Sequence, residues 1–436
     1  MRRKSLLRLE VWGKAPNRTP LLIRGARQVG KTWLVREYAK SFSSFVEINF
    51  ESHPEFRQPF QELFGKPQEL LSAIALVSGK KIVVGETLLF LDEIQYSKEA
   101  LLALRYFKEE LPQLHVIGCG SLLEFTIREL SFPVGRIEFL YLFPLNFEEY
   151  LLALKREDLV EAIRRADTER PLPQAVHELL LKEIGMYCLV GGMPEVVHAY
   201  LQMRDLAESE RIQSRLIGTF REDFYKYASR AKTEHLRRVF EGIPRLFGQK
   251  FKYAHIDAES HGRDLKTALE LLEGAGLVYR TFHTSAHGIP LGSQVKENRF
   301  KVFLVDIGLS LRMLGLNLSQ LFLEQKVLLA NRGPLAEQFV AQEIVSYTKV
   351  NDHPKLFYWH REAKSSMAEV DFVIEKENAI WPIEVKSARG TKIKSLYLFM
   401  REREAVVPGA LKISAEPFSQ REKVTTIPLY AVGNLF

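Results

Sequence analysis

Eight consecutive residues near the start of the chain, GARQVGKT, combine two glycines with a lysine and a threonine at fixed spacing. They fit the pattern G-x-x-x-x-G-K-S/T at each fixed position, after a short apolar run of buried-strand type and before a helical pattern. In such a loop the backbone N–H groups surround phosphate oxygens, the lysine reaches the β- and γ-phosphates, and the hydroxyl ligates Mg²⁺. The sequence therefore predicts a site for ATP and Mg²⁺, formed by Gly25, Ala26, Arg27, Gln28, Val29, Gly30, Lys31 and Thr32.

Two carboxylates, Asp92 and Glu93, follow a second apolar run, Leu88–Leu91. If this run is a buried strand of an α/β sheet, both acids lie at the carboxyl edge of the sheet, where such sheets bind ligands. We expect Asp92 to hold the hydration shell of Mg²⁺ and Glu93 to polarise the attacking water as the catalytic base. Together with Lys31, these residues predict hydrolysis of the bound nucleotide.

Two further residues are candidates for the same site, and each has an ordinary alternative. Ser121 follows the third apolar run and can contact the γ-phosphate, but Ser121 and Glu124 can also form a capping box for the next helix. Arg136 can act as a catalytic arginine finger, because a guanidinium matches the charge of a transferring phosphate. It can equally be a surface arginine.

A second group of charged residues, near the end of the chain, has the order Glu337, Asp371, Glu384, Lys386. Glu337 lies on an expected helix and the others on two expected strands, where Glu384 and Lys386 share a face because side chains alternate. The three carboxylates can converge on one Mg²⁺ or Mn²⁺ ion, with Lys386 as the catalytic residue that orients the water. The alternative is a salt-bridged sheet in which Lys386 pairs with Glu384 or Asp371.

The elements that must position the first site alternate between strands and helices. This order predicts a mostly parallel sheet with helices on both faces. Asn146 and Glu149 then predict a capping box at the start of a further helix. The strand patterns cover Pro20–Ile23, Phe45–Phe50, Thr87–Leu91 and Leu114–Ile117, and the helical patterns cover Thr32–Lys40 and Ser97–Glu110.

The rest of the chain divides into a mostly helical stretch and a small α/β unit. In the middle, expected helices over His235–Phe247 and Arg263–Leu272 precede an expected hairpin of Leu277–Phe282 and Arg299–Val305, which is the order of a winged helix. The last part combines a helix near Pro334 with three strand patterns. At about 150 residues per domain, 436 residues suggest three domains. We expect them at 1–170, 171–330 and 331–436.

The composition excludes several classes of protein. With 46% hydrophobic and 26% charged residues, the chain is neither disordered nor of low complexity. Two cysteines, Cys119 and Cys188, exclude a disulfide scaffold and a Cys-rich zinc site. Neither a signal-peptide pattern nor a run of about 18 uncharged residues occurs, so we expect a soluble, cytoplasmic protein without membrane contact.

The formal net charge of +7 is unevenly distributed. The segment Arg211–Lys252 contains 11 basic and four acidic residues, and a second basic run extends from Lys386 to Arg403, including Arg389 and Lys392. These segments are either contact surfaces for a phosphate backbone or solvated faces whose acidic partners come from elsewhere in the fold. Nucleic acid is therefore an expected partner.

Taken together, these motifs resemble one family, the prokaryotic AAA-type ATPases with a C-terminal domain of unknown function. The resemblance covers nearly the whole chain. It implies an α/β protein with a P-loop AAA-type ATPase domain, then a helical, winged-helix-like middle domain, then a small C-terminal domain resembling a PD-(D/E)XK nuclease or restriction endonuclease. The family often has serines where this chain has Cys119 and Gly120. Besides the first loop, the matching stretches are Asp92–Gln95, Gly135-Arg136, Pro144–Phe147, Gly191–Pro194, Val305–Leu309 and Pro382–Lys386.

Three functions follow from these observations. The preferred one is ATP binding and hydrolysis, coupled to action on nucleic acid by the nuclease-like domain. A second is a nucleotide-controlled DNA- or protein-binding regulator with an inactive nuclease fold. A third is a protein-remodelling ATPase. An arginine finger acting between chains would also require a homo-oligomer.

Overall fold

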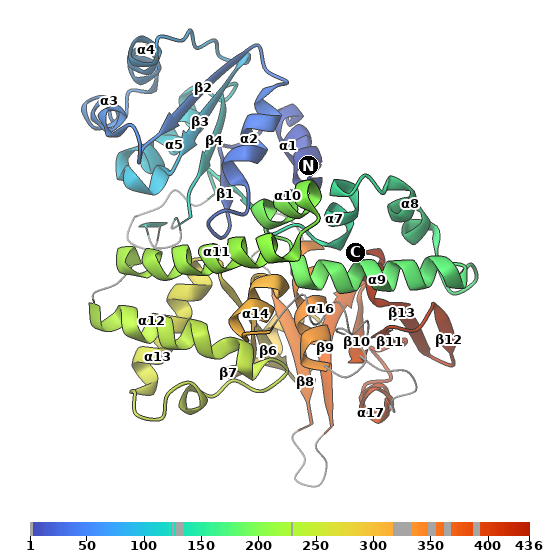
Figure 1. Ribbon diagram of the computed structural model, residues 1–436. Coiled ribbons are helices and arrows are strands. Elements are labelled where there is room, and N and C mark those ends of the chain that lie inside the picture. Colours follow the sequence, from blue (N-terminus) through green and yellow to red (C-terminus); the bar gives the residue numbers. More distant parts are fainter. Residues whose placement is uncertain are drawn as a thin grey trace. The chain divides into compact units, whose positions relative to one another are not determined.

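The chain folds into two compact units, seen in the computed structural model in Figure 1. Unit 1 is Met1–Phe143, and most of Pro144–Phe436 forms unit 2. Three residues that carried sequence predictions, Glu124, Arg389 and Lys392, lie outside the described residues. The structure describes residues 3–121, 123, 126–127, 135–227, 230–316, 333–347, 355–361, 368–386 and 393–436.

Unit 1 is built on a five-stranded sheet with the strand order β2-β3-β4-β1-β5. Each pair of neighbouring strands is parallel, as the sequence predicts. The strands are β1 (Leu21–Arg24), β2 (Ser44–Asn49), β3 (Thr87–Asp92), β4 (His115–Cys119) and β5 (Glu138–Tyr141). The helices are α1 (Lys4–Lys14), α2 (Lys31–Ala39), α3 (Arg57–Glu62), α4 (Pro67–Ser78) and α5 (Lys98–Glu110).

Helices cover both faces of this sheet. Figure 1 shows α1 and α2 on one face and α3, α4 and α5 on the other. The central strands β3 and β4 are buried along their whole length, because a parallel sheet between two helical layers has no solvated face. The core on the α5 side includes Phe50, Phe60, Leu91, Leu104 and Phe107. The predicted parallel sheet with helices on both faces is confirmed.

Unit 2 begins with helices. Asn146 caps the first of them: its side chain accepts from Glu149 N, and the Glu149 carboxylate accepts from Asn146 N, so the predicted capping box is confirmed. The helices of unit 2 are α7 (Phe147–Ala153), α8 (Glu157–Arg165), α9 (Gln174–Val190), α10 (Pro194–Met203), α11 (Leu206–Tyr227), α12 (Arg230–Gly242), α13 (Gly262–Gly274), α14 (Ile307–Met313), α16 (Gly333–Tyr347) and α17 (Lys394–Glu402).

One predicted helix has different bounds. The sequence predicts a helix over His235–Phe247, but α12 begins at Arg230 and ends at Gly242. A 3-10 turn, Ile243–Leu246, continues the chain. Pro244 explains the early end, because proline has no N–H to donate within an α-helix.

The strands of unit 2 form one eight-stranded mixed sheet, in the order β12-β13-β11-β10-β9-β8-β6-β7. β6 and β7 form the antiparallel hairpin that the sequence predicts, and β6 also pairs with β8 in parallel. The helix α16 packs against β7, β8 and β10, and α17 packs against β9 and β10. The strands are β6 (Val278–Thr284), β7 (Val295–Leu304), β8 (Leu356–His360), β9 (Glu369–Lys376), β10 (Ala379–Lys386), β11 (Ala410–Ser414), β12 (Ser419–Arg421) and β13 (Val424–Pro428).

The joint sheet crosses the expected domain boundary near residue 330. The sequence predicts a middle domain over 171–330 and a separate domain over 331–436, with the hairpin in the first. In the structure the hairpin and the C-terminal strands share one sheet, because Thr281 pairs with Leu356. Strand patterns show where strands lie but not which strands pair, so this arrangement was not visible in the sequence.

Three of the stretches that carry the family resemblance meet inside unit 2. Leu145 N donates to Gly192 O (2.7 Å), and Asp306 accepts from Gly192 N (2.6 Å) and Leu309 N (2.9 Å). Gly191 has a φ of 77°, and a Cβ there would lie 2.3 Å from Asp306 Oδ1, so only glycine fits. These motif residues therefore hold helices together.

No helix in the described part of the chain is long and apolar enough to cross a membrane.

Candidate nucleotide-binding site and a second charged cluster

The loop Gly25–Thr32 connects the carboxyl end of β1 to the start of α2. Its backbone turns through left-handed conformations at Gln28 (φ 65°) and Gly30 (φ 94°). At Gly25 a Cβ would lie 2.1 Å from Leu142 O, so the loop packs too closely for any other residue. Such a loop at a helix N-terminus presents backbone N–H groups to an anion.

Lys31, the lysine of the motif, is held inside the loop. Its Nζ donates to Gly25 O and Ala26 O at 2.9 Å each, and the residue is only 7% exposed. Burial lowers the pKa of Lys31, while the carboxylates of Glu93 and Asp92 oppose that shift. The ammonium is thus placed at the loop where phosphates are expected to bind.

Asp92 is fixed by hydrogen bonds to both of its carboxylate oxygens. Oδ2 accepts from Thr32 Oγ1 (3.1 Å) and Asn49 Nδ2 (3.1 Å). Oδ1 accepts from Cys119 Sγ (2.8 Å) and from Glu93 N (3.0 Å). A hydroxyl and a carboxylate in contact at the phosphate loop are oxygen donors of the type that Mg²⁺ prefers, so the residues fit this ion.

Glu93 occupies a strained position directly after β3. Its φ is 49°, and burial raises the pKa of its carboxyl group, which suits a general base. Gln95 Nε2 donates to Glu93 Oε2 (2.5 Å). At Gly120 a Cβ would lie 1.9 Å from Gln95 Oε1, so the absent side chain leaves the space that Gln95 fills.

Sequence reasoning assigned no role to Asn49, Gln95 or Cys119, which contact Asp92 and Glu93. Asn49 is the partner of Asp92 in the β2–β3 register, and Cys119 ends the neighbouring strand β4. The available signal was position: polar residues at the carboxyl ends of parallel strands meet at one edge. Burial raises the pKa of the Cys119 thiol, so this group is a hydrogen-bond donor rather than a thiolate.

Ser121 and Arg136 take different places in the sheet. Ser121 lies two residues after β4, at the same edge as Glu93. Arg136 precedes β5, which runs parallel to β1, so it lies at the amino edge of the sheet, opposite the phosphate loop. Its side chain is 52% exposed and pairs with Glu109 (3.4 Å). The structure therefore does not bring Arg136 to the nucleotide site of its own chain.

In unit 2 the predicted residues Glu337, Asp371, Glu384 and Lys386 do converge. Val385 N donates to Asp371 Oδ2 (2.8 Å), and Lys386 Nζ lies 2.5 Å from Glu384 Oε1. The ion pair that the sequence left open as the alternative is thus present. Burial raises the pKa of Glu337 to about 8 and of Glu384 to about 7, and it also raises the pKa of Asp371.

Two residues that the sequence did not single out, Lys301 and Glu369, complete this cluster. Lys301 Nζ lies 2.7 Å from Glu369 Oε1, 3.1 Å from Glu337 Oε2 and 3.8 Å from Asp371 Oδ1. Burial alone would lower the pKa of Lys301, but the carboxylates outweigh it and raise the pKa. The sequence feature that could have indicated Lys301 is a lysine inside an apolar run, Phe300–Leu304. Within the described ranges, no group of three or more His, Cys, Asp or Glu residues is arranged to hold a metal ion.

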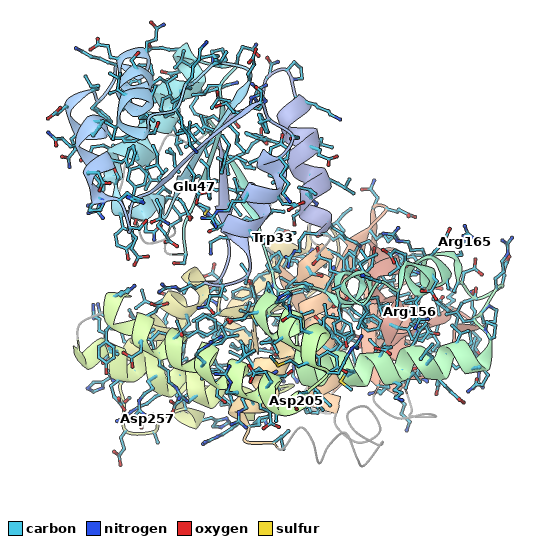
Figure 2. All side chains as sticks on the ribbon, turned by 45° about the horizontal axis from the view of Figure 1, so that its top comes forward. Trp33, Glu47, Arg156, Arg165, Asp205 and Asp257 are labelled. Carbon is cyan, nitrogen blue, oxygen red and sulfur yellow. The ribbon has the colours of Figure 1, made fainter. Side chains whose placement is uncertain are left out.

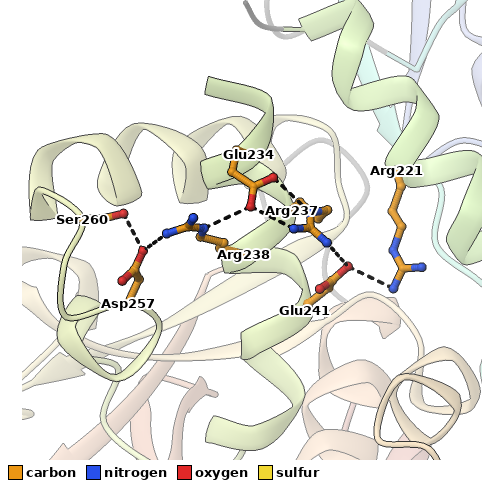
Figure 3. Close-up of polar contacts among 7 residues, drawn as sticks. All are labelled: Arg221, Glu234, Arg237, Arg238, Glu241, Asp257 and Ser260. Carbon is orange, nitrogen blue, oxygen red and sulfur yellow. Dashed lines mark hydrogen bonds and ion pairs between the residues drawn. The ribbon is translucent and has the colours of Figure 1, made fainter. Parts of the chain in front are cut away.

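The basic segment Arg211–Lys252 is largely compensated by acids. Figure 3 shows a network in which Arg237 and Arg238 pair with Glu234, while Arg221 pairs with Glu241. Several partners lie outside the segment, as the solvated-face interpretation requires. Arg211 pairs with Glu208, Arg215 with Glu195, Arg238 with Asp257 and Lys250 with Glu369.

Three family models match parts of the chain. Residues 17–151 match an AAA domain, and residues 181–320 and 332–431 match two domains of unknown function, DUF8612 and DUF4143. No curated protein matches the chain.

Similar solved structures include three archaeal proteins. A Walker-type ATPase of Pyrococcus abyssi is 17% identical, with a TM-score of 0.46 over 72% of this chain and 95% of that one. The ORC1 protein of Aeropyrum pernix in complex with DNA is 15% identical, with a TM-score of 0.27 over 71% and 91%. A signal transduction ATPase with numerous domains and a tetratricopeptide repeat sensor, from Pyrococcus horikoshii, is 14% identical, with a TM-score of 0.27 over 79% and 48%.

The family match and the geometry of the phosphate loop agree. The segment that matches the AAA domain contains the loop, Asp92 and Glu93 on a parallel sheet of the expected kind. The chain therefore contains a P-loop ATPase domain of the AAA type, within residues 17–151.

Proposed function

We propose that the protein binds ATP with Mg²⁺ and hydrolyses it at the site on unit 1. The observation that supports this most is the 3.1 Å hydrogen bond between Thr32 Oγ1 and Asp92 Oδ2, beside the buried Lys31. Thr32 and Asp92 would hold Mg²⁺, directly or through its waters. When bound, the ion supplies positive charge that neutralises the phosphate oxygens.

The other residues of the site have separate roles in this proposal. The loop Gly25–Thr32 binds phosphate oxygens through its N–H groups, and Lys31 contacts the β- and γ-phosphates. Glu93 accepts a proton from the attacking water. The Glu93 carboxylate is held in place by the hydrogen bond from Gln95. Ser121 contacts the γ-phosphate from the neighbouring strand end. Arg136 serves the site of a second copy of the chain, because it lies away from its own.

Two substitutions test this proposal by separating binding from hydrolysis. Lys31→Ala should abolish ATP binding, because it removes the ammonium from the loop. Glu93→Gln should keep ATP binding and slow hydrolysis by roughly two to four decades, the usual effect of losing a general base. Lys40→Ala, at the end of α2 and paired with Glu37 on the surface, is the matched control and should change neither.

Trp33 provides the binding signal for this experiment. It follows Thr32 directly and is 41% exposed, as labelled in Figure 2, so its fluorescence should respond to nucleotide. Phosphate release measures hydrolysis. Unchanged nucleotide affinity in Lys31→Ala, or equal turnover in Glu93→Gln, would show that these residues do not have the proposed roles.

For unit 2 we propose the nucleotide-controlled regulator rather than the nuclease. The specific observation is Lys301, whose ammonium lies among the carboxylates on which a metal-dependent nuclease would rely. In this proposal the winged-helix-like part, α12, α13 and the β6–β7 hairpin, and the nuclease-like part bind a nucleic acid or protein partner without cutting it.

Incubation of the full-length protein with DNA and RNA tests the proposal for unit 2. The incubation is run with and without ATP, and with Mg²⁺ or Mn²⁺. The expected result is ATP-dependent binding of a partner and intact strands. Strand cleavage that needs the metal and disappears in Lys386→Ala would establish the nuclease instead.

A further inference from the structure

Six charged side chains form a buried cluster in unit 2, which we call the Lys301 cluster. They come from β7, α16 and the adjacent strands β9 and β10, so three parts of the sequence contribute to it. Lys301 is at the centre and is only 1% exposed. The members are Lys301, Glu337, Glu369, Asp371, Glu384 and Lys386.

Most carboxylate oxygens of this cluster already lie beside an ammonium or backbone N–H group of the protein. Glu337 and Glu369 each have an oxygen within about 3 Å of Lys301 Nζ, at 3.1 and 2.7 Å. Asp371 Oδ2 accepts from Val385 N, and its Oδ1 faces Lys301 at 3.8 Å. Glu384 Oε1 is paired with Lys386. The metal that a nuclease-type fold implies would have to compete with ammonium groups for these oxygens.

One oxygen points to an incomplete site. Glu384 is 6% exposed, and its Oε2 is buried with no hydrogen-bond partner among the described residues. An unpaired buried carboxylate oxygen is costly, and a cation beside it would relieve the cost. Lys301 therefore balances the cluster without satisfying every oxygen in it.

Charge balance explains why Lys301 and a divalent ion exclude each other. Four carboxyl groups face Lys301 and Lys386, and Lys250 lies 3.7 Å from Glu369. Because burial raises the pKa of Glu337 to about 8, this group keeps its proton near pH 7, and three carboxylates then balance three ammonium groups. A divalent ion added to this set would leave net positive charge in a buried place, next to an ammonium that it repels. Without Lys301 the set carries two negative charges once Glu337 is ionised, and one divalent ion neutralises them.

We infer that Lys301 is the built-in cation of this cluster, so that the wild-type protein binds no divalent metal there, and that removing its ammonium converts the cluster into a divalent cation site. No three of these carboxylates are arranged to hold a metal ion in the described structure, so the new site requires Glu337, Asp371 and Glu384 to close on the ion once the ammonium is gone. This inference deepens the regulator proposed for unit 2 and does not depend on ATP hydrolysis in unit 1. Metal binding and strand cleavage are measured separately, so one can fail without the other.

The experiment compares wild type with Lys301→Met in the full chain, without nucleotide. Methionine keeps the length of the side chain and removes its charge, which leaves buried carboxylates uncompensated and should lower the melting temperature. Saturating Mn²⁺ should then raise the melting temperature of Lys301→Met by roughly 5 °C more than that of wild type. Electron paramagnetic resonance should count one more bound Mn²⁺ in the variant than in wild type.

Two controls locate the effect. Lys412→Met makes the same change at another buried lysine of the same sheet, paired with Glu416, and should lower the melting temperature without recovery in Mn²⁺. Adding Asp371→Asn to Lys301→Met should remove the extra Mn²⁺, which separates this site from ions bound at unit 1. If Lys301→Met does not fold, Lys301→Gln replaces it.

Two results would overturn the inference. One is a melting shift with Mn²⁺ in wild type that Asp371→Asn abolishes, since the native cluster would then bind metal despite Lys301. The other is a folded Lys301→Met or Lys301→Gln protein that gains no bound Mn²⁺. The wild-type measurement is decisive even if both variants fail to fold.

Discussion

Asp92 and Asp306 show how the same side chain serves two purposes in one chain. Asp92 accepts from side chains of three different elements and lies beside the motif threonine, so its hydrogen bonds orient a ligand site. Asp306 accepts from two backbone N–H groups and caps α14, so its hydrogen bonds hold helices together. Both are buried, and burial raises the pKa of Asp306 to about 6.

The pKa of Asp306 predicts a pH dependence of stability. Between its unfolded pKa of about 4 and its folded pKa of about 6, the folded state binds more protons, so the free energy of unfolding falls as pH rises. The fall should be on the order of 3 kcal/mol and complete above about pH 6. In Asp306→Asn this contribution is absent. The difference in the free energy of unfolding between wild type and Asp306→Asn, measured with urea at pH 4.5, 5.5 and 7, should therefore shrink as the pH rises.

Asp306→Asn has a second, pH-independent effect. One amide oxygen replaces two carboxylate oxygens, so Gly192 N or Leu309 N loses its acceptor, at about 1–3 kcal/mol. Ser310→Ala removes a hydroxyl that donates to the Asp306 carbonyl and serves as a control without titration. A difference between wild type and Asp306→Asn that stays constant from pH 4.5 to 7 would mean that Asp306 titrates at its ordinary pKa in the folded protein.

At the scale of elements, acidic side chains neutralise part of the positive charge of the helix α12. Arg237 and Arg238 are paired with Glu234, Glu241 and Asp257 (Figure 3). Replacing both arginines by alanine should therefore change DNA affinity by less than about twofold. Removing an arginine that contacts a phosphate reduces the slope of log affinity against log salt concentration by roughly one. If both arginines contacted DNA, the double variant would therefore have a slope smaller by about two.

Fluorescence anisotropy with a labelled duplex at several salt concentrations measures this. Lys394→Ala with Arg401→Ala, two exposed residues of α17, is the comparison from the second basic run. If the α12 variant loses more than tenfold in affinity and its salt slope falls, the arginines leave their acidic partners to contact DNA, and the compensated-surface interpretation is wrong.

The elements themselves were largely predictable, and their pairing was not. The strands β1 to β4 and β6 to β10 lie within a few residues of their apolar patterns, because such runs have no other stable place in a globular fold. The phosphate loop was visible because its chemistry is contiguous in sequence. The Lys301 cluster was only partly visible, because Lys301 and Glu369 reach it through the β6–β8 pairing, which no local pattern encodes. The strands β5 and β11 to β13 and the helices α1, α3, α4 and α17 were not predicted at all.

At the scale of the whole molecule, the position of Arg136 predicts that activity depends on assembly. Arg136 lies at the opposite sheet edge from the phosphate loop of its own chain, so the finger role that we propose requires a nucleotide on another copy. The ATPase rate per chain should therefore rise with protein concentration. Arg136→Ala should lower the rate at high concentration by roughly three to five decades, the usual effect of losing an arginine finger.

Mixing experiments distinguish this from a local effect. Arg136→Ala keeps a complete phosphate loop and Lys31→Ala keeps a complete finger, so a mixture of the two inactive variants should regain part of the activity. Arg105→Ala, whose arginine shares the partner Glu109 with Arg136, is the matched control. A rate per chain that is constant over a hundredfold dilution, in a protein that sediments as a monomer, would exclude the arrangement between chains.

The shared sheet of unit 2 has a consequence for how the chain is made on the ribosome. The hairpin β6–β7 leaves the ribosome well before β8, which is the permanent neighbour of β6. Until β8 arrives, β6 presents a row of free backbone N–H and C=O groups, and such an open edge recruits strands from other chains. In a fragment that starts at residue 331, β6 is missing, so β8 has the open edge instead. Synthesis of this protein therefore passes through a stage at which β6 has an open edge, and truncation between the hairpin and β8 makes that stage permanent.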